Sequence, residues 1–181
     1  MKYLPDKLLY LPLVLVILTS ACKQNEGRKH PDRNEFNTQK ELVDRANRYL
    51  VGQDKELINS YATRRGWHLQ TTESGLFYEI YEHGTGTSAR SGGYALITYE
   101  LSLLDGTPCY ISKVSGPKKI MIGQSTDETG LIQGLLMLRE GDKARFILPP
   151  HLAHGLLGDE NKIPPRSIIV YELELLEVTD R

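Results

Sequence analysis

The amino-acid sequence predicts an α+β domain in which a twisted antiparallel sheet wraps around one short helix. Several segments alternate apolar with polar residues, as strands do when they bury one face and expose the other. These segments are residues 94–103, 143–148 and 169–175. Leu131, Leu135 and Leu138 recur at helical spacing and predict the one short helix between these strands. Gly141 can end that helix.

The first residues have the composition of a bacterial export signal. Lys2 and Lys7 precede an apolar run over residues 8–18, and three small residues then lead to Cys22. The run is shorter than the roughly 20 residues that a membrane-spanning helix needs, which favours a secretory signal peptide over residues 1–21. The end of the run resembles the lipobox of bacterial lipoproteins, so we expect lipidation of Cys22; the alternative is an incidental or buried cysteine. Lipidation would anchor the protein to a membrane of the cell envelope, facing the periplasm.

Two further segments separate the signal from the sheet. Residues 22–37 are polar and predict a tether, and residues 38–66 predict a helical N-terminal segment. A capping box that starts at Thr38 begins the first of two short helices, and Gly52 can end it. The second helix ends near Gly66. Each helix carries an apolar stripe that needs a partner, which is either the domain that follows or a second copy of the chain in a homodimer.

After Trp67 the pattern changes from helical to strand-like. Residues 76–81 are rich in aromatic and β-branched residues and predict a strand that stops at Gly84 and Gly86. No helix pattern or lysine follows these glycines, so they do not form a phosphate-binding loop.

Composition and charge limit the classes of function. The 181 residues are 40% hydrophobic and 25% charged, and the formal net charge is −1. These values indicate a globular domain with extensions and give no electrostatic field for holding nucleic acid. The two cysteines, Cys22 and Cys109, are too few for a disulfide framework and lack the spacing of a zinc site. We therefore expect no metal, no other cofactor, and a free thiol at Cys109.

A series of short motifs runs in fixed order through the second half of the chain. Its most specific parts are Leu-Pro-Pro-His-Leu-Ala-His-Gly at 148–155, Ile-Pro-Pro at 163–165 and Val-Tyr-Glu-Leu-Glu-Leu-Leu at 170–176. In this order and spacing they resemble the FKBP family, and the likeness places an FKBP-like domain at residues 67–181. The lipid-type signal and the N-terminal helical segment also resemble the gliding-motility-associated lipoproteins of that family.

The resemblance implies an enzyme that isomerises X-Pro peptide bonds in proline-containing polypeptides. The barrier to this rotation is about 18–20 kcal/mol, because rotation breaks amide resonance. A dry apolar pocket favours the twisted amide over the planar, charge-separated one, so no nucleophile, metal or cofactor is required. Carried over by position, the resemblance places six residues in the pocket: Tyr99, Tyr110, Leu131, His154, Ile163 and Tyr171. Taken without the resemblance, inward tyrosines and leucines are more often core than site.

The sequence departs from the family pattern mainly at this pocket. Cys109-Tyr110 stands where active members usually have Phe-Asp, and Asp127-Glu128 stands where an apolar pair contacts the substrate backbone. Desolvation opposes two charges in a dry wall unless the side chains of Asp127 and Glu128 turn outward. His154 stands where a tyrosine is usual and can still donate a hydrogen bond to a substrate carbonyl.

Three functions remain open from these residues. The first is a weak prolyl isomerase that assists the folding of exported proteins. The second is a chaperone or assembly factor that uses the same pocket to bind without catalysis. The third treats the N-terminal helices as a docking element for a larger envelope complex.

Overall fold

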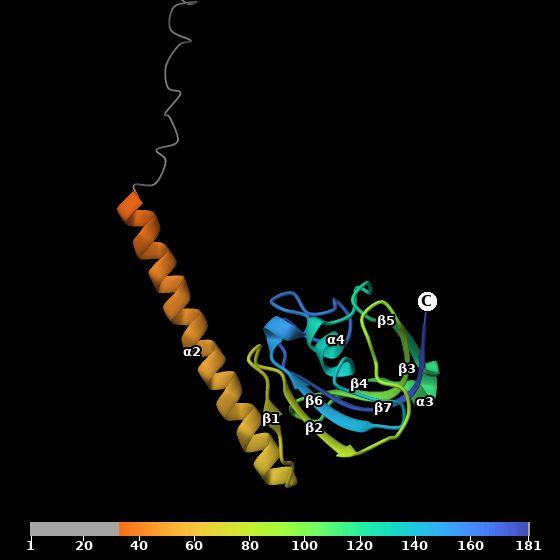
Figure 1. Ribbon diagram of the computed structural model, residues 1–181. Coiled ribbons are helices and arrows are strands. Elements are labelled where there is room, and N and C mark those ends of the chain that lie inside the picture. Colours follow the sequence, from red (N-terminus) through yellow and green to blue (C-terminus); the bar gives the residue numbers. More distant parts are fainter. Residues whose placement is uncertain (1–32, 181) are drawn as a thin grey trace, which may run out of the picture. The chain divides into compact units, whose positions relative to one another are not determined.

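The computed structural model describes residues 33–180 (Figure 1). The signal peptide predicted over 1–21, Cys22 and most of the predicted tether lie outside the described residues. The helices are α2 (Arg33–Arg65), α3 (Ser112–Ser115), α4 (Thr129–Leu135) and the short 3₁₀ helix η2 (Pro150–Leu152). The strands are β1 (Gln70–Thr71), β2 (Phe77–Glu82), β3 (Tyr94–Leu103), β4 (Pro108–Ile111), β5 (Lys118–Met121), β6 (Lys143–Leu148) and β7 (Ile169–Thr179).

The strands form one antiparallel sheet that curls around helix α4 (Figure 1). The strand order is β1-β2-β6-β7-β3-β4, and β5 pairs with β3 beyond this path. The long central pair is β3 with β7, whose register runs from Tyr94 opposite Thr179 to Leu103 opposite Ile169. This arrangement confirms the predicted α+β class and the sheet wrapped around a short helix.

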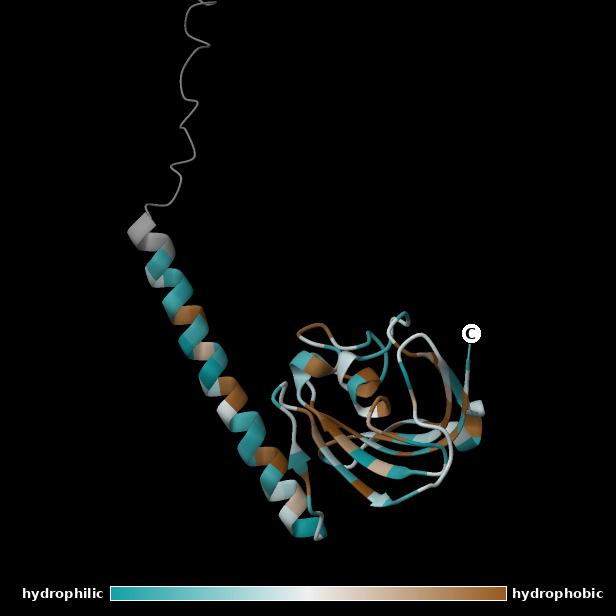
Figure 2. Ribbon diagram, viewed as in Figure 1, coloured by the Kyte–Doolittle hydropathy of each residue, from teal (hydrophilic) through white to brown (hydrophobic). Residues whose placement is uncertain are grey.

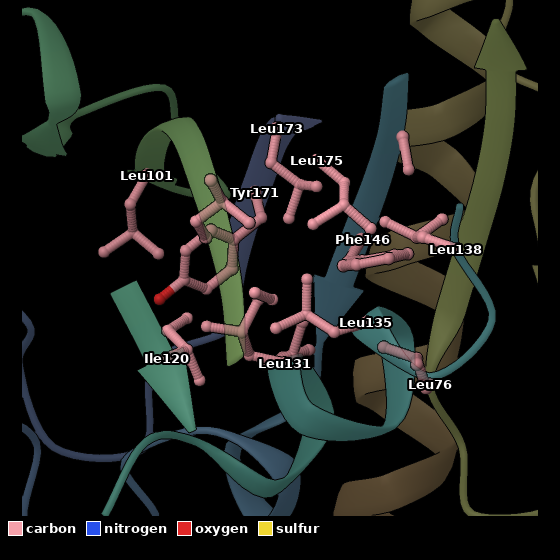
Figure 3. Close-up of a cluster of buried hydrophobic side chains, with 14 of the residues drawn as sticks. Leu76, Leu101, Ile120, Leu131, Leu135, Leu138, Phe146, Tyr171, Leu173 and Leu175 are labelled. Atoms are coloured by element: carbon pink, nitrogen blue, oxygen red, sulfur yellow. The ribbon is translucent and has the colours of Figure 1, made fainter. Parts of the chain in front are cut away.

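The main core fills the space between the concave face of the sheet and α4 (Figure 3). Leu131 and Leu135 of α4 are fully buried against alternate residues of the strands. Those inward residues include Ile97, Leu101, Ala144, Phe146, Leu148, Tyr171, Leu173 and Leu175. Figure 2 shows hydrophobic stretches on the helix inside the curled sheet and on the strands around it. The two-residue alternation in the sequence therefore identified the inward face correctly.

A second apolar cluster covers the opposite face of the sheet. Ile58 and Tyr61 of α2 pack against Phe77, Ile147 and Val170, which lie on β2, β6 and β7 and point away from the main core. These strands are thus buried on both faces, which explains why apolar residues stand next to each other in β6 and β7.

A polar contact fixes α2 beside this cluster. The Arg166 Nη2 atom lies 3.1 Å from both carboxylate oxygens of Asp54, a buried residue of α2, and 3.5 Å from the backbone oxygen of Leu50. Arg166 has a φ of 56°, which is uncommon for a residue with a side chain. Its backbone N–H donates to the oxygen of Gly155, 2.9 Å away. One residue therefore closes the loop 155–166 and ties it to α2. The sequence left open whether the N-terminal helical segment packs on the domain that follows or on a second copy of the chain. The C-terminal half of α2 packs on its own domain.

The prediction of two short N-terminal helices was wrong, because α2 is one continuous helix. It begins at Arg33, so residues 33–37 of the predicted tether are helical and Thr38 lies inside the helix instead of capping it. Gly52 also lies inside the helix, where glycine costs about 1 kcal/mol relative to alanine. Good helix formers on both sides, and the docking of Ile58 and Tyr61, outweigh that cost. The predicted end of the helix was right: Gly66, with a φ of 65°, follows Arg65.

The helix predicted over Leu131 to Leu138 is shorter than expected. Helix α4 ends at Leu135, and Leu138 is buried from the turn that follows. Gly141 has a φ of 88° and lies in the turn that enters β6 instead of ending the helix.

Replacing Gly52 with alanine is expected to stabilise the protein by about 0.5–1 kcal/mol, because alanine loses less backbone entropy in a helix. A Cβ atom at this position would meet nothing within 4 Å. The free energy of unfolding in urea measures the effect. Gly66→Ala is the matched control and should destabilise, because its backbone is left-handed. A loss of stability in Gly52→Ala would instead indicate that the helix breaks at this residue.

Candidate functional site

Side chains from distant parts of the sequence line a cavity of about 350 Å³ at one end of the sheet. Strands β3, β4, β5 and β7 contribute to its wall, together with the residue before α4 and the loop that follows η2. The lining residues are Tyr99, Leu101, Tyr110, Lys118, Glu128, His154, Asp159, Asn161 and Tyr171.

Four of the six predicted pocket residues lie in this lining: Tyr99, Tyr110, His154 and Tyr171. The rings of Tyr99 and Tyr171 are tilted by 49° with their centroids 5.7 Å apart, and form one wall. Leu131 and Ile163 lie in the main core, only 0% and 2% exposed, and Figure 3 shows Leu131 in the same cluster as Ile120 and Tyr171. The structure therefore places these two residues in the core of the domain, outside the cavity lining.

The sequence left open whether Glu128 lies in the pocket wall or turns outward, and the structure places it in the wall. Its side chain is only 8% exposed. The Oε1 atom accepts a hydrogen bond from the Tyr171 hydroxyl at 3.0 Å and lies 2.8 Å from His154 Nε2. The Oε2 atom is buried and has no hydrogen-bond partner in the described part of the chain. These two partners compensate part of the free-energy cost of desolvating the carboxylate.

Asp127 also turns inward, where it forms an ion pair with Lys118 of β5. Burial opposes the positive charge of Lys118, but the hydrogen bond and the charge of Asp127 outweigh burial and raise the lysine pKa. The positive charge of Lys118, which lines the cavity, is thus balanced by Asp127 beside it.

Burial raises the pKa of the Tyr171 hydroxyl well above its usual value, and the charge of Glu128 raises it further. Tyr171 is therefore neutral at neutral pH and can donate its hydroxyl hydrogen to Glu128.

Asp159 organises the opposite rim of the cavity. Its Oδ2 atom accepts a hydrogen bond from the Tyr110 hydroxyl, and its Oδ1 atom accepts from the backbone N–H groups of Asn161 at 2.9 Å and Ile163 at 2.7 Å. Burial would raise the pKa of this carboxyl group, but the Tyr110 hydroxyl and the two N–H groups lower it to about 2. Asp159 was missed at the sequence level, although an aspartate that bonds the backbone two residues on is a recognised turn signal.

Cys109 lies beside this rim as a buried free thiol, as the sequence predicts. Burial raises the pKa of the thiol, and the charge of Asp159 adds to the effect. A thiolate is therefore disfavoured, and Cys109 behaves as a small apolar residue instead of a nucleophile.

Asp159→Asn is expected to reduce the free energy of unfolding on the order of 1 kcal/mol at pH 7, after allowance for solvent screening. The folded pKa of about 2 lies below the ordinary value of 3.8, so this stabilisation is complete above pH 3.8 and disappears as the pH falls toward 2. Urea unfolding at pH 7 and at pH 2.5 measures it. The parent and the variant should differ at pH 7 and converge in acid; an equal difference at both pH values would contradict the assignment.

Within residues 33–180 no group of three or more His, Cys, Asp or Glu side chains is arranged to hold a metal ion. In the same range, no helix has the length and apolar character needed to cross a membrane.

Comparison with known proteins gives a consistent result. The profile of the family described as FKBP-type peptidyl-prolyl cis-trans isomerase matches residues 86–176, half of the chain. The FKBP-type peptidyl-prolyl cis-trans isomerase FkpA of Escherichia coli K12 is 30% identical over 124 residues, which are 68% of this chain and 44% of that protein. The inactive peptidyl-prolyl cis-trans isomerase FKBP6 of Mus musculus is 29% identical over 113 residues, 60% of this chain and 34% of that one.

A solved structure agrees with the sequence comparisons. The crystal structure of AtFKBP13 superposes with a TM-score of 0.58 at 26% identity, and covers 61% of this chain and 98% of that one. The chain spans less than half of the length of the two curated relatives described above. The curled sheet, the buried helix and the matched residues support the same assignment. The chain belongs to the FKBP-type peptidyl-prolyl cis-trans isomerase family.

Proposed function

We propose that the chain catalyses cis/trans isomerisation of X-Pro bonds in the cavity between Tyr99, His154 and Tyr171. The observation that carries this proposal is the aromatic wall of Tyr99 and Tyr171, which stands over a fully packed apolar core in a fold of the prolyl-isomerase family.

The chemistry of the wall suits a reaction without covalent steps. Tyr99, Leu101 and Tyr171 offer apolar surface to the proline ring, which lowers the cost of desolvating the twisted amide. Most polar groups of the lining already have partners in the protein: Lys118 pairs with Asp127, and the Asp159 carboxylate takes three hydrogen bonds. Glu128 makes the wall less apolar than the family pattern implies, so the rate is expected to be modest.

Proline-limited refolding of a client protein tests this function. Uncatalysed X-Pro isomerisation takes tens to hundreds of seconds, so it limits refolding of chains that need a trans-to-cis change. The purified chain, at concentrations well below that of the client, should accelerate the slow phase without changing its final amplitude. A slow phase that is unchanged at every concentration would contradict catalysis.

A second candidate is a binding module that holds unfolded clients without isomerising them. The buried carboxylate of Glu128 in the pocket wall favours this candidate, and one relative carries the word inactive in its name. Light scattering of an aggregating client separates the two. Suppressed aggregation with an unchanged slow refolding phase supports the binding module, whereas an accelerated slow phase supports the enzyme.

The compartment belongs to the same proposal. The apolar run followed by Cys22 supports a lipoprotein anchored in the cell envelope, facing the periplasm, whose clients are exported proteins. The likeness to gliding-motility-associated lipoproteins points to clients of the envelope machinery. Mass spectrometry of the native protein should find a lipidated cysteine at position 22 as the first residue. A chain that retains residues 1–21, or a Cys22→Ser variant that stays in washed membranes, would contradict the anchor.

A homodimer through α2 completes the proposal. Leu42, Tyr49 and Leu57 recur near one side of the helix and are 57%, 65% and 54% exposed, so an apolar stripe remains available for a second copy. Light scattering coupled to size exclusion should give the mass of a dimer for the parent and of a monomer for Tyr49→Glu. Lys55→Glu, a charge change outside the stripe, is the control and should remain dimeric. A monomeric parent would contradict the dimer.

A further inference from the structure

The loop that follows η2 forms one side of the cavity. His154, Asp159 and Asn161 lie on this loop and line the cavity, whereas the aromatic wall belongs to β3 and β7. This rim loop, residues 153–166, contains no helix or strand. Its conformation therefore depends on the contacts that its residues make with each other and with the elements around it.

Two separate sets of contacts hold the rim loop. At its tip, the carboxylate of Asp159 accepts hydrogen bonds from the Tyr110 hydroxyl and from the backbone N–H of Ile163. At its base, the backbone N–H of Arg166 donates to the oxygen of Gly155, 2.9 Å away. The tip is thus held from within the loop and by β4, and the base is closed by Arg166.

Arg166 has a backbone conformation that depends on its surroundings. Its φ of 56° lies in the left-handed region, where the Cβ atom crowds the following carbonyl oxygen. A residue with a side chain keeps this conformation only where other contacts hold it, and such residues cluster at ligand-binding sites. Here α2 supplies the contacts, because the guanidinium lies 3.1 Å from both oxygens of Asp54 and 3.5 Å from the backbone oxygen of Leu50. The base of the rim loop is therefore fixed by a helix of which no described residue lines the cavity.

Asp54 is buried in the contact with Arg166. It is only 5% exposed, whereas acidic residues are almost never fully buried without a partner. Apolar packing alone docks α2 one and two turns further along, at Ile58 and Tyr61. The two oxygens of Asp54 add a defined position for the guanidinium, which apolar packing does not give. The Asp54–Arg166 ion pair therefore sets where the base of the rim loop lies relative to the docked half of α2.

Resting on the function proposed above, we infer that Asp54 and Arg166 are positioning residues of the isomerase, through which the docked half of α2 holds the rim loop in the conformation that binds the X-Pro segment. Neither residue touches the substrate. The aromatic wall stands on the paired strands β3 and β7, which keep their register without the loop. Loss of the ion pair should therefore weaken peptide binding more than it slows the bound peptide. Coupling between two sites is reciprocal, so a bound peptide should in turn strengthen the docking of α2.

Asp54→Ala removes the ion pair with the least damage to the fold. Alanine is the best helix former, and the Arg166 side chain is 36% exposed, so its charge can turn to water. The constants kcat and KM for a Leu-Pro peptide are measured by NMR exchange spectroscopy. We expect KM to rise roughly threefold to tenfold, the size usual for a mutation that acts on a site through a network, while kcat stays within about twofold. A merely structural role would lower the folded fraction, and with it the apparent kcat, at an unchanged KM.

A second substitution tests whether the effect belongs to the ion pair. Glycine at position 166 accepts the left-handed backbone and keeps the N–H that bonds Gly155, but it has no guanidinium. The double variant Asp54→Ala/Arg166→Gly should therefore have the KM of Asp54→Ala, because the ion pair is already absent. Glu56→Ala is the matched control, since Glu56 is an exposed acidic residue of the same helix. It should retain both constants of the parent.

Hydrogen exchange of backbone amides follows the rim loop and α2 directly. In Asp54→Ala the N–H groups of Ile163 and Arg166 should exchange faster than in the parent, because the base of the loop opens more often. The amides shared by β3 and β7 should keep their protection. A saturating concentration of the Leu-Pro peptide should slow exchange in α2 after Asp54 in the parent, and this effect should be absent in Asp54→Ala.

An active parent whose KM is unchanged in Asp54→Ala overturns this inference and leaves the proposed isomerase in place. Equal exchange of the rim-loop amides in the parent and in Asp54→Ala has the same consequence. A further rise of KM in the double variant overturns the assignment of the effect to the ion pair. A parent that catalyses no exchange of the peptide overturns the proposed function and, with it, this inference.

Discussion

Gly134→Val is expected to cost about 3 kcal/mol or more of folding stability, at or above the upper end of the usual range for overpacking a core. Gly134 lies on the face of α4 that meets β6, and a Cβ atom there would stand 2.4–2.7 Å from three carbon atoms of the Phe146 ring. Phe146 is fully buried between the strands and the helix, so its ring has no free space to move into. The helix can approach the sheet this closely only because residue 134 has no side chain.

Urea unfolding measures the loss, and a compensating substitution tests its cause. Phe146→Leu removes part of the ring that obstructs the new side chain. This test uses the smaller substitution Gly134→Ala. The double variant Gly134→Ala/Phe146→Leu should lose less stability than the sum of the losses in Gly134→Ala and in Phe146→Leu. Strict additivity would mean that Gly134 and Phe146 do not limit each other. Gly52→Ala serves as the matched control, since it adds a methyl group to a helical glycine in open surroundings.

Tyr171→Leu is expected to reduce the catalysed isomerisation rate at least about tenfold. The substitution removes the aromatic ring that packs beside Tyr99 in the cavity wall, and it removes the hydroxyl that donates to Glu128. Tyr171 is only 2% exposed, so the substitution also reduces the stability of the domain. We expect a loss of at most about 3–5 kcal/mol, the range for truncating a buried aromatic side chain to alanine. The rate is therefore read only after circular dichroism and urea unfolding have shown that the variant is folded.

Tyr171→Phe separates the ring from the hydroxyl. It keeps the apolar wall, so its rate should stay within a few-fold of the parent. It should lose about 1–3 kcal/mol of stability, because a buried acceptor on Glu128 loses one of its two donors. Equal rates in the parent and Tyr171→Leu would show that the tilted pair of tyrosines does not form the catalytic wall.

Local patterns predicted the strands that have one clear buried face. Residues 94–103 and 143–148 were predicted with the bounds that β3 and β6 have, because both strands alternate inward and outward residues. Strands β4 and β5 have four residues each, too few for an alternation to be recognised, and were missed. Helix α2 was divided at Gly52 because a glycine suggests a helix end. Tertiary packing of Ile58 and Tyr61 is not visible in a local window.

The aromatic part of the candidate site could be predicted from the sequence, whereas the contacts between residues that meet only in the fold could not. The inward tyrosines Tyr99 and Tyr171 followed from strand periodicity together with the family resemblance. The hydrogen bond between Tyr171 and Glu128 could not follow from either, since the two residues are 43 apart in the sequence and meet only in the fold. Considered singly, a glutamate is expected outside, and only the two donors that Tyr171 and His154 bring to it change that expectation.

The central claim is that this cavity isomerises X-Pro bonds, and one measurement tests it most directly. The cis/trans exchange rate of a Leu-Pro peptide is followed by NMR at pH 6 with the purified chain at a few per cent of the peptide concentration. We expect the rate to exceed the uncatalysed value, which corresponds to tens to hundreds of seconds, and to rise in proportion to the protein concentration. An exchange rate that stays at the uncatalysed value at every protein concentration would contradict the account.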